Sequence, residues 1–252
     1  MCMQTIVMSF IIYKFLNCNK MNKSDTHHGG LLKGDDLRHI YENRFDGRLK
    51  YRKKVWSILI RDYFQQYIDS GGAVLDLGSG YCEFINQIKC AKKYALDLNP
   101  KTGVRAGKDV KVILQDCLEP WSIESDSIDV VFTSNFFEHL PDKQRLANLL
   151  EKVKNCLKVG GRLIAMGPNI KYAPGSYWDF WDHYIPLTEN SLSEALVHAG
   201  FTIEKSISKF TPFTMAKGIQ YPMFFVAAYL RFPLFWRFFG KQFVVIAKKD
   251  KI

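Results

Sequence analysis

The residues best suited to chemistry are a glycine turn and three acids, each of which follows a short apolar run. Val74–Leu77 reads as a buried strand that leads into the turn Gly78–Gly80. Such a turn lets a ligand approach the backbone where side chains would otherwise block it. Asp97 ends the next apolar run, 21 residues after Asp76, in a place that suits a ribose diol, and Asp116 ends the third run. Acids at three consecutive strand ends beside this turn predict a nucleoside site.

The glycine turn does not match a dinucleotide fingerprint. That fingerprint needs a third glycine three places after Gly80, where the helix start approaches a pyrophosphate. This chain has Glu83 there, and its negative charge would repel phosphate. NAD and FAD are therefore disfavoured, whereas a cationic nucleoside without phosphates is compatible.

The elements that must position these residues alternate between short apolar runs and helical stretches, which is typical of a parallel α/β sheet. We expect helices at Leu37–Phe45 and Arg48–Ile68, after the glycine turn, between Pro141 and Gly160, and from a cap at Thr188 or Ser191 to Gly200. The predicted strands are Ala73–Leu77, Lys93–Leu98, Val110–Gln115, Asp129–Ser134, Gly161–Gly167, Phe201–Ser208 and Phe243–Lys249.

The net charge of +10 lies mostly outside this central region. Residues 1–70 carry +5 and residues 171–252 carry +4, whereas residues 71–170 carry only +1. Basic flanks can contact nucleic acid, anionic lipid or a phosphorylated substrate. The basic run between Arg48 and Lys54 fits either a solvated helix face or a contact with phosphate or a headgroup.

The stretch Lys205–Lys249 has an unusual composition. It contains no Asp or Glu, eight Lys and Arg residues, and twelve aromatic residues. Pro222 and Pro233 each favour the start of a short helix, and the uncharged run between Pro222 and Arg231 is too short to span a membrane. Such a segment can lie in a membrane interface or line an apolar pocket, although aromatic residues often simply form core.

The six cysteines give no support for a metal site. They form no C-x-x-C pair and have no nearby histidine at ligand spacing, so we expect no metal and reduced thiols in a cytoplasmic protein. The apolar run Thr5–Ile12 is short, has no basic segment before it and has no cleavage site, which disfavours a signal peptide. A frayed tail, or translation that starts at Met21, fits this run better.

The ordered motifs of the chain resemble those of class I S-adenosylmethionine-dependent methyltransferases over roughly residues 71–249. The element Glu138-His139-Leu140 is most similar to small-molecule biosynthetic methyltransferases. The chain departs from the family pattern at Cys82, where a third glycine is common, and we expect the thiol to intrude slightly on the cofactor. The motifs that carry the resemblance are Asp76–Gly80, Asp97, Asp116, Ser127–Leu140 and Leu157–Leu163.

The resemblance implies S-adenosyl-L-methionine as the cofactor. The glycine turn would pass under its methionine moiety, with Asp76 orienting the amino-acid end and Asn135 closing the site beside the sulfonium. Asp97 would hold the ribose hydroxyls, and Asp116 with Cys117 would face the adenine amine. The expected cofactor-binding residues are Asp76, Gly78, Ser79, Gly80, Asp97, Leu98, Asp116, Cys117 and Asn135.

Two histidines are candidates for removing a proton from an acceptor. His139 follows the fourth strand, and His183 lies in an aromatic segment that could close over the site. We favour His183, because Asp179 and Asp182 are close in sequence and would raise its basicity.

The resemblance further implies a Rossmann-like class I methyltransferase fold, α/β, with a central mostly parallel seven-stranded sheet and helices on both faces. We divide the chain into a flexible tail (residues 1–34), a helical cap (35–70) and a methyltransferase domain (71–252) with an aromatic and basic insert (210–240). We predict O-methylation of an amphipathic small molecule: a lipid-linked or envelope saccharide, a quinone precursor or a polyketide. The insert would contact the cytoplasmic face of a membrane. One alternative is an RNA methyltransferase, although the nearly neutral central region argues against RNA binding. The other is a catalytically silent protein that binds cofactor or membrane.

Overall fold

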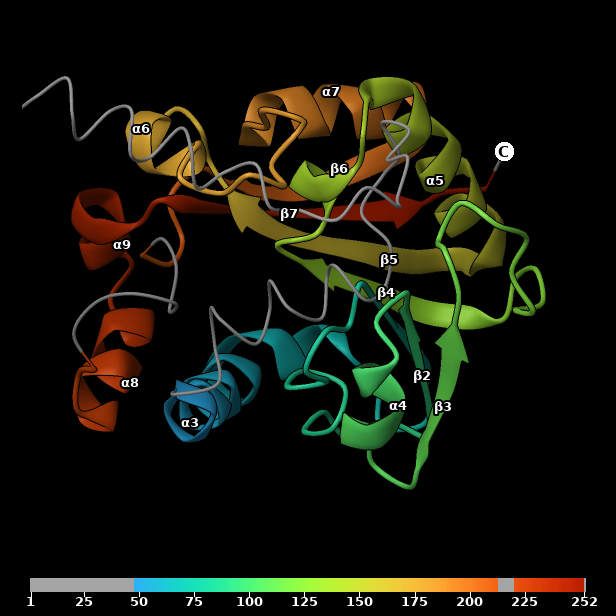
Figure 1. The fold of residues 1–252 in the computed structure, drawn as a ribbon, viewed down its shortest axis with the longest axis horizontal. Coiled ribbons are helices and arrows are strands. Elements are labelled where there is room, and N and C mark those ends of the chain that lie inside the picture. Colours follow the sequence, from blue (N-terminus) through green and yellow to red (C-terminus); the bar gives the residue numbers. More distant parts are fainter. Residues whose placement is uncertain (1–47, 213–219, 252) are drawn as a thin grey trace, which may run out of the picture. The chain divides into compact units, whose positions relative to one another are not determined.

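The computed structural model describes residues 48–212 and 220–251 of the 252-residue chain. The predicted tail (residues 1–34), the helix Leu37–Phe45 and residues 213–219 of the insert lie outside the described residues. Within the described part, seven strands form one sheet in the order β3-β2-β1-β4-β5-β7-β6 (Figure 1). The strands are β1 (Ala73–Leu77), β2 (Lys92–Asp97), β3 (Val110–Leu114), β4 (Ile128–Ser134), β5 (Leu157–Pro168), β6 (Phe201–Ile207) and β7 (Gln242–Lys249).

The register of the parallel strands brings their carboxyl ends to one edge of the sheet. Leu77 at the end of β1 pairs with Leu96 of β2 and with Thr133 of β4, and Asp97 pairs with Leu114 of β3. Strand β7 runs antiparallel to both β5 and β6. The predicted mostly parallel seven-stranded fold is therefore confirmed.

Helices cover both faces of the sheet (Figure 1). On one face, Leu149 of α5 and Leu192 of α7 belong to the same buried cluster as Leu75. On the other face, Trp56 of α3 and Leu230 of α8 belong to a second cluster. The helices are α3 (Leu49–Leu59), α4 (Lys101–Arg105), α5 (Lys143–Cys156), α6 (Pro174–Tyr177), α7 (Glu189–His198), α8 (Met223–Arg231) and α9 (Pro233–Phe239).

Several predicted helix boundaries are wrong, each for a local reason. The predicted helix Arg48–Ile68 continues beyond α3 as a π-helical segment, η3 (Ile60–Phe64), and a 3₁₀ turn, η4 (Gln65–Tyr67). Helix α5 begins after the N-cap Asp142, whose side chain accepts from the backbone N–H of Arg145, so Pro141 lies outside the first turn. It ends well before Gly160, because β5 already begins at Leu157.

Two further helix predictions depended on caps and turns. The N-cap of α7 is Thr188, and it forms a capping box with Ser191, so the alternative cap at Ser191 is wrong. The segment after the glycine turn, residues 81–88, forms hydrogen-bonded turns, and the helix expected there is absent. Pro222 and Pro233 do stand at the starts of α8 and α9, as predicted.

The aromatic side chain of Phe64 anchors η3 to the sheet, and its substitution offers a test of this packing. Phe64 is fully buried against the rings of Trp56, Phe84 and Phe132. We expect Phe64→Ala to lower the free energy of unfolding by about 3–5 kcal/mol, because it leaves a cavity among these rings. Phe238→Ala is the matched control, since Phe238 is 71% exposed and should change stability little. Chemical denaturation measures both, and equal midpoints would contradict the packing described here.

Candidate active site

The glycine turn joins the end of β1 to the edge where the parallel strands finish. Gly78 and Gly80 have φ of +70° and +50°, in the left-handed region that favours glycine. A Cβ on Gly78 would lie 2.5 Å from ring carbons of Phe136, so no other residue fits there. The turn is fixed to the next strand, because the Gly80 N–H donates to Asp97 Oδ2 at 2.6 Å.

Asp76 is a buried acid at the floor of a cavity. It is 3% exposed, and burial followed by the nearby charge of Asp97 raises the pKa of Asp76 well above its usual value. Among the described residues no Lys, Arg or His forms a salt bridge with it. A carboxylate in this position is suited to a positively charged group of a ligand.

Asp97 is the last residue of β2, and Asp116 follows the end of β3 by two residues at the same edge. The carboxylate of Asp97 accepts the N–H groups of Gly80 and Asn99 at 2.6 and 2.7 Å. Burial raises the pKa of Asp97, whereas these backbone hydrogen bonds lower it in part. Asp116 accepts the N–H of Leu118 at 2.8 Å. Both acids are positioned by their own strand ends, as the sequence predicts.

The other expected cofactor residues divide into two groups. Ser79 and Asn135 line the cavity together with Asp76, Gly78 and Gly80. Asp97, Leu98, Asp116 and Cys117 do not line it; they lie at or just after the ends of β2 and β3, where Leu98 is 38% exposed and Cys117 is buried. Burial raises the pKa of the Cys117 thiol to about 12, so this sulfur stays protonated.

Asn135 is held tightly at the end of β4. It has φ of +51°, its N–H donates to Met166 O at 2.8 Å, and its Oδ1 accepts from Gln242 Nε2 at 2.6 Å. Gln242 starts β7 and also lines the cavity. The sequence did not reveal Gln242, because β7 follows β4 by more than a hundred residues and only the sheet order brings them together.

Cys82 has φ of +58°, a conformation that fits the glycine often found at this place in the family. Its side chain is fully buried in the cluster that contains Phe84, and it does not line the cavity. The thiol therefore packs inside this cluster and lies outside the cavity wall, and its effect on cofactor binding stays a prediction. Glu83, next to it, accepts two hydrogen bonds from Arg52 at 2.7 and 2.6 Å, which ties α3 to the glycine turn.

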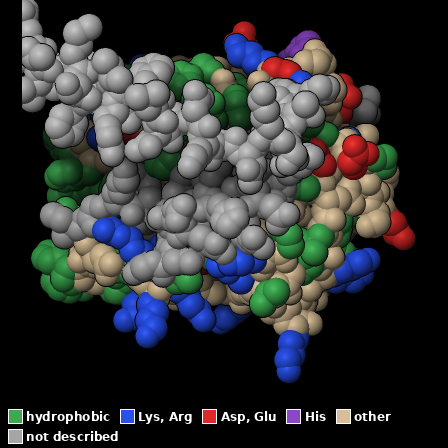
Figure 2. Space-filling view, viewed as in Figure 1, with side chains coloured by type: hydrophobic (Ala, Val, Ile, Leu, Met, Phe, Trp, Pro, Cys, Tyr) green, Lys and Arg blue, Asp and Glu red, His purple; other side chains and the backbone are tan. Residues whose placement is uncertain are grey.

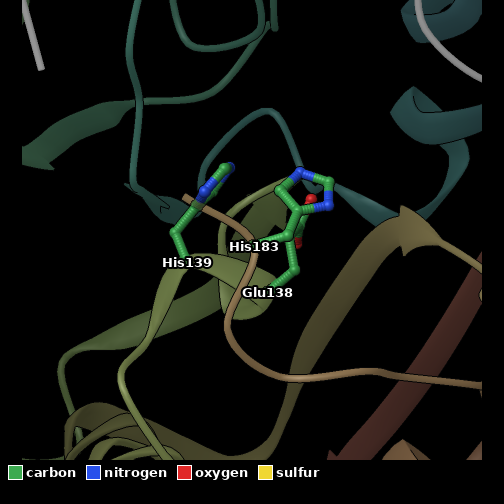
Figure 3. A group of neighbouring side chains, drawn as sticks. All are labelled: Glu138, His139 and His183. Carbon is green, nitrogen blue, oxygen red and sulfur yellow. The ribbon is translucent and has the colours of Figure 1, made fainter. Parts of the chain in front are cut away.

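His139 and His183 come together beside a third group, Glu138 (Figure 3). Glu138 and His139 belong to the 3₁₀ turn η5 (Phe137–His139), which follows β4. The backbone carbonyl of Glu138 accepts the N–H groups of Tyr184 and Ile185 at 2.8 and 3.2 Å. These two hydrogen bonds hold the aromatic segment that carries His183 against η5, so both histidines line the cavity.

The electrostatics of this cluster are unusual. Burial raises the pKa of Glu138 to about 7, partly offset by His139. Burial lowers the pKa of His139, but its hydrogen bond to Asp182 and the charge of Glu138 together raise it above the ordinary value. His139 Nδ1 lies 2.8 Å from Asp182 O and 3.2 Å from Asp182 Oδ2. Asp179, the other acid expected near His183, is exposed.

The cavity itself has a volume of about 720 Å³ and two kinds of wall. The glycine turn, Asn135 and the histidines form the polar wall. Residues of α3 and of the insert form the aromatic wall. The aromatic residues that line it are Tyr51, Trp56, Tyr81, Phe84, Phe132, Phe180, Tyr221, Phe225, Tyr229 and Phe239.

The residues present fit S-adenosylmethionine. Gly78 leaves the space that a Cβ would fill, Asp76 offers a buried negative charge, and Asp97 ends β2 beside the turn. The hydroxyl of Ser79 is buried and has no hydrogen-bond partner within the described part of the chain. By the resemblance, Asp76 and Ser79 would contact the amino-acid end of the cofactor, Asp97 the ribose, and Asp116 with Cys117 the adenine.

Comparisons with known proteins agree with this reading. The family model described as "Methyltransferase domain" matches residues 75–165. A SAM-dependent methyltransferase from Archaeoglobus fulgidus is 22% identical, with a TM-score of 0.58 over 81% of this chain and 99% of that chain. The N-methyltransferase NodS from Bradyrhizobium japonicum is 12% identical, with a TM-score of 0.54 over 81% and 98%. No curated protein matches the sequence.

At these identities the solved structures support the fold, while the family match identifies the domain. The matched residues contain β1 with Asp76, the glycine turn, and the acids at the ends of β2 and β3. They also contain η5 with Glu138 and His139. Residues 75–165 therefore match a methyltransferase domain, and the described chain has the fold of S-adenosylmethionine-dependent methyltransferases, whose cofactor is S-adenosylmethionine.

Proposed function

We propose that the enzyme transfers a methyl group to a hydroxyl of an amphipathic small molecule, at the boundary of a membrane. The observation that carries this proposal is that one cavity connects the cofactor turn to the aromatic insert. A ligand in it would meet polar side chains at one end and aromatic rings at the other. This combination suits a molecule with a polar head and an apolar body.

The polar side chains at one end of the cavity support a hydroxyl oxygen as the atom that accepts the methyl group. The cofactor would supply a methyl group on a sulfonium. When the acceptor oxygen bonds to the methyl carbon, the electron pair of the C–S bond stays on sulfur and the acceptor proton passes to His183 or His139. His139 and His183 line the cavity with Glu138, where they can hold and orient a hydroxyl. The Tyr177 ring, which lies 4.8 Å from the His183 ring, helps to fix its orientation.

The exposed face of the insert supports the proposal that the enzyme contacts a membrane. Helices α8 and α9 carry large apolar side chains that no other part of the described structure covers. Figure 2 shows hydrophobic side chains at the left of the view, where Figure 1 places these two helices. Phe225 and Phe239 are exposed and also line the cavity, so the cavity opens among these side chains. We call this surface the aromatic patch: Tyr221, Phe224, Phe225, Phe232, Leu234, Phe235, Phe238 and Phe239.

The chemistry of the patch matches a bilayer surface. Arg231 and Arg237 lie on the same two helices, and the stretch between Lys205 and Lys249 has no acid. Aromatic and basic side chains together bind the headgroup region of anionic membranes. Within the residues that the structure describes, no helix is long and apolar enough to span a bilayer. The proposal is therefore contact with the surface, through which an amphipathic acceptor reaches the cavity.

Cofactor binding should depend on Asp97. We expect Asp97→Asn to weaken the binding of S-adenosylhomocysteine about 10- to 100-fold, because charge-assisted hydrogen bonds to the ribose are lost. Isothermal titration calorimetry measures this change. The control is Asp109→Asn, an exposed acid between β2 and β3 whose replacement should leave the affinity unchanged. Equal affinity for both variants would contradict the assigned role of Asp97.

Methyl transfer should depend on the buried histidines. His183→Ala and His139→Ala should each lower turnover about 10²- to 10⁴-fold while leaving S-adenosylhomocysteine binding intact. The acceptor is first found by incubating lipid and polar cell extracts with methyl-labelled cofactor, and rates are then measured on the labelled fraction. His198→Ala, an exposed histidine at the end of α7, is the control. Full turnover by His183→Ala would exclude it from catalysis.

Membrane binding should depend on the aromatic patch. We expect the protein to float with vesicles containing phosphatidylglycerol more than with pure phosphatidylcholine. Replacing Phe224, Phe232 and Phe238 together by Ser should reduce flotation at least about tenfold, because the apolar area that enters the interface is lost.

The matched control for this variant replaces three exposed valines outside the patch, Val104, Val159 and Val197, by Ser. These changes remove less apolar surface and lie outside the patch, so flotation should persist. The membrane contact would be contradicted if the wild-type protein floated with neither vesicle type, or if both triple variants lost flotation equally. The proposal of methyl transfer would still stand.

A further inference from the structure

Three side chains that commonly bind metal ions converge at the polar end of the cavity. One ligand atom from each of Glu138, His139 and His183 lies within 4.8 Å of the other two. Figure 3 shows the carboxylate of Glu138 beside the ring of His183, with the ring of His139 nearby. We call these residues the Glu-His-His cluster. The cysteine spacing that argued against a zinc site has no bearing on them.

The hydrogen bonds of His139 prepare it to be a ligand. Its Nδ1 is occupied by the carbonyl of Asp182 at 2.8 Å, with Asp182 Oδ2 at 3.2 Å. Both partners are acceptors, so Nδ1 carries the proton and Nε2 offers its lone pair. A carboxylate or carbonyl behind the non-coordinating nitrogen is the usual arrangement around a metal-bound histidine. Asp182 is 1% exposed, so solvent does not weaken this contact.

The carboxylate of Glu138 is buried, and one of its oxygens is not hydrogen-bonded to any described residue. Its side chain is 2% exposed, and Oε1 has no hydrogen-bond partner in the described part of the chain. No Lys or Arg among residues 48–212 and 220–251 forms a salt bridge with Glu138. Arg52, which also lines the cavity, is engaged with Glu83. A buried carboxylate oxygen without a hydrogen-bond partner is costly in a protein interior, and a bound cation would satisfy it.

We propose that the Glu-His-His cluster binds one divalent first-row transition-metal ion at the polar end of the cavity. Two imidazoles and one carboxylate suit Zn²⁺, Fe²⁺, Co²⁺ and Mn²⁺ better than Mg²⁺, which prefers oxygen ligands. Three protein ligands leave at least one coordination position open toward the cavity. Tetrahedral bonds of about 2.0–2.2 Å place ligand atoms about 3.3–3.6 Å apart, so binding would require the ligand atoms to approach one another by up to about 1.5 Å.

The bound cation would act on the hydroxyl compound that accepts the methyl group. Only this role of the cation rests on the proposed function. An acceptor hydroxyl in the open position is polarised by the cation, so its proton leaves to solvent more readily. His139 and His183 would then act as ligands that hold the cation. Asp182 would be a positioning residue that fixes the tautomer of His139.

The direct test is metal binding by the full-length protein after treatment with a chelator. Co²⁺ serves as the probe, because its visible absorption reports coordination by nitrogen ligands independently of activity. We expect saturable binding of one Co²⁺ per chain and displacement by Zn²⁺. Mg²⁺ should not compete at similar concentrations.

Variants assign this binding to the cluster. Glu138→Gln, which preserves shape, and His183→Ala should each weaken Co²⁺ binding at least about 100-fold, and Asp182→Asn about 10-fold because only the positioning contact changes. Replacing His198 by Ala, or His27 and His28 together, should have no effect. Circular dichroism and S-adenosylhomocysteine binding verify that each variant is folded.

The outcomes separate this inference from the proposed function. If wild-type protein binds no Co²⁺, or if Glu138→Gln binds it as well as wild type, the metal site is wrong. If methyl transfer then still depends on His183, the histidines contact the acceptor directly and the proposed function stands. If metal binds but no labelled acceptor is found in any extract, the proposed function fails while the site itself is supported.

Discussion

The parallel register of β1, β2, β3 and β4 is the constraint on which the site depends. It places the glycine turn, Asp97, Asp116 and Asn135 at one edge, although they are spread over about sixty residues of sequence. The hydrogen bond from Gly80 to Asp97 then fixes the turn to its neighbour. A one-residue slip of β2 would turn Asp97 to the opposite face of the sheet and remove this contact.

A second set of contacts attaches the acceptor side to this edge. The backbone of Glu138 accepts two N–H groups from the segment that follows His183, and Asp182 contacts His139. Helix α3 is joined to the turn by the Arg52–Glu83 pair, and the insert adds the aromatic wall. The cavity therefore lies between elements that are each fixed to the sheet or the turn. This arrangement brings two chemically different walls together.

Much of the fold could be predicted from the sequence, because strands and turns depend on local pattern. All seven strands were predicted within a few residues, and the acids at the ends of β2 and β3 were found because strand ends follow chain order. The π-helical segment η3 was missed, since its residues keep a helical apolar pattern that does not distinguish π-helical from α-helical geometry. The capping box of α7 was ambiguous because Thr188 and Ser191 are both good caps.

The candidate site was harder to predict where it depends on tertiary proximity. Glu138 appeared only as part of a family motif, and nothing local indicated that it would be buried beside His183. The pairing of Asp182 with His139 could not be read from spacing, which instead suggested an effect on its neighbour His183. Gln242 and Asn135 meet only because β7 inserts between β5 and β6. The only signal that the sequence offered for this part of the site was Glu138 and His139 in the family motif.

A crystal structure of the full-length protein with S-adenosylhomocysteine tests the central claim most directly, which is that one cavity joins the cofactor site to the acceptor site. We predict its amino-acid end at Asp76 and Ser79, its ribose at Asp97, and its sulfur facing the part of the cavity that His139 and His183 line. A ligand bound elsewhere, or oriented with its sulfur away from these histidines, would contradict the account.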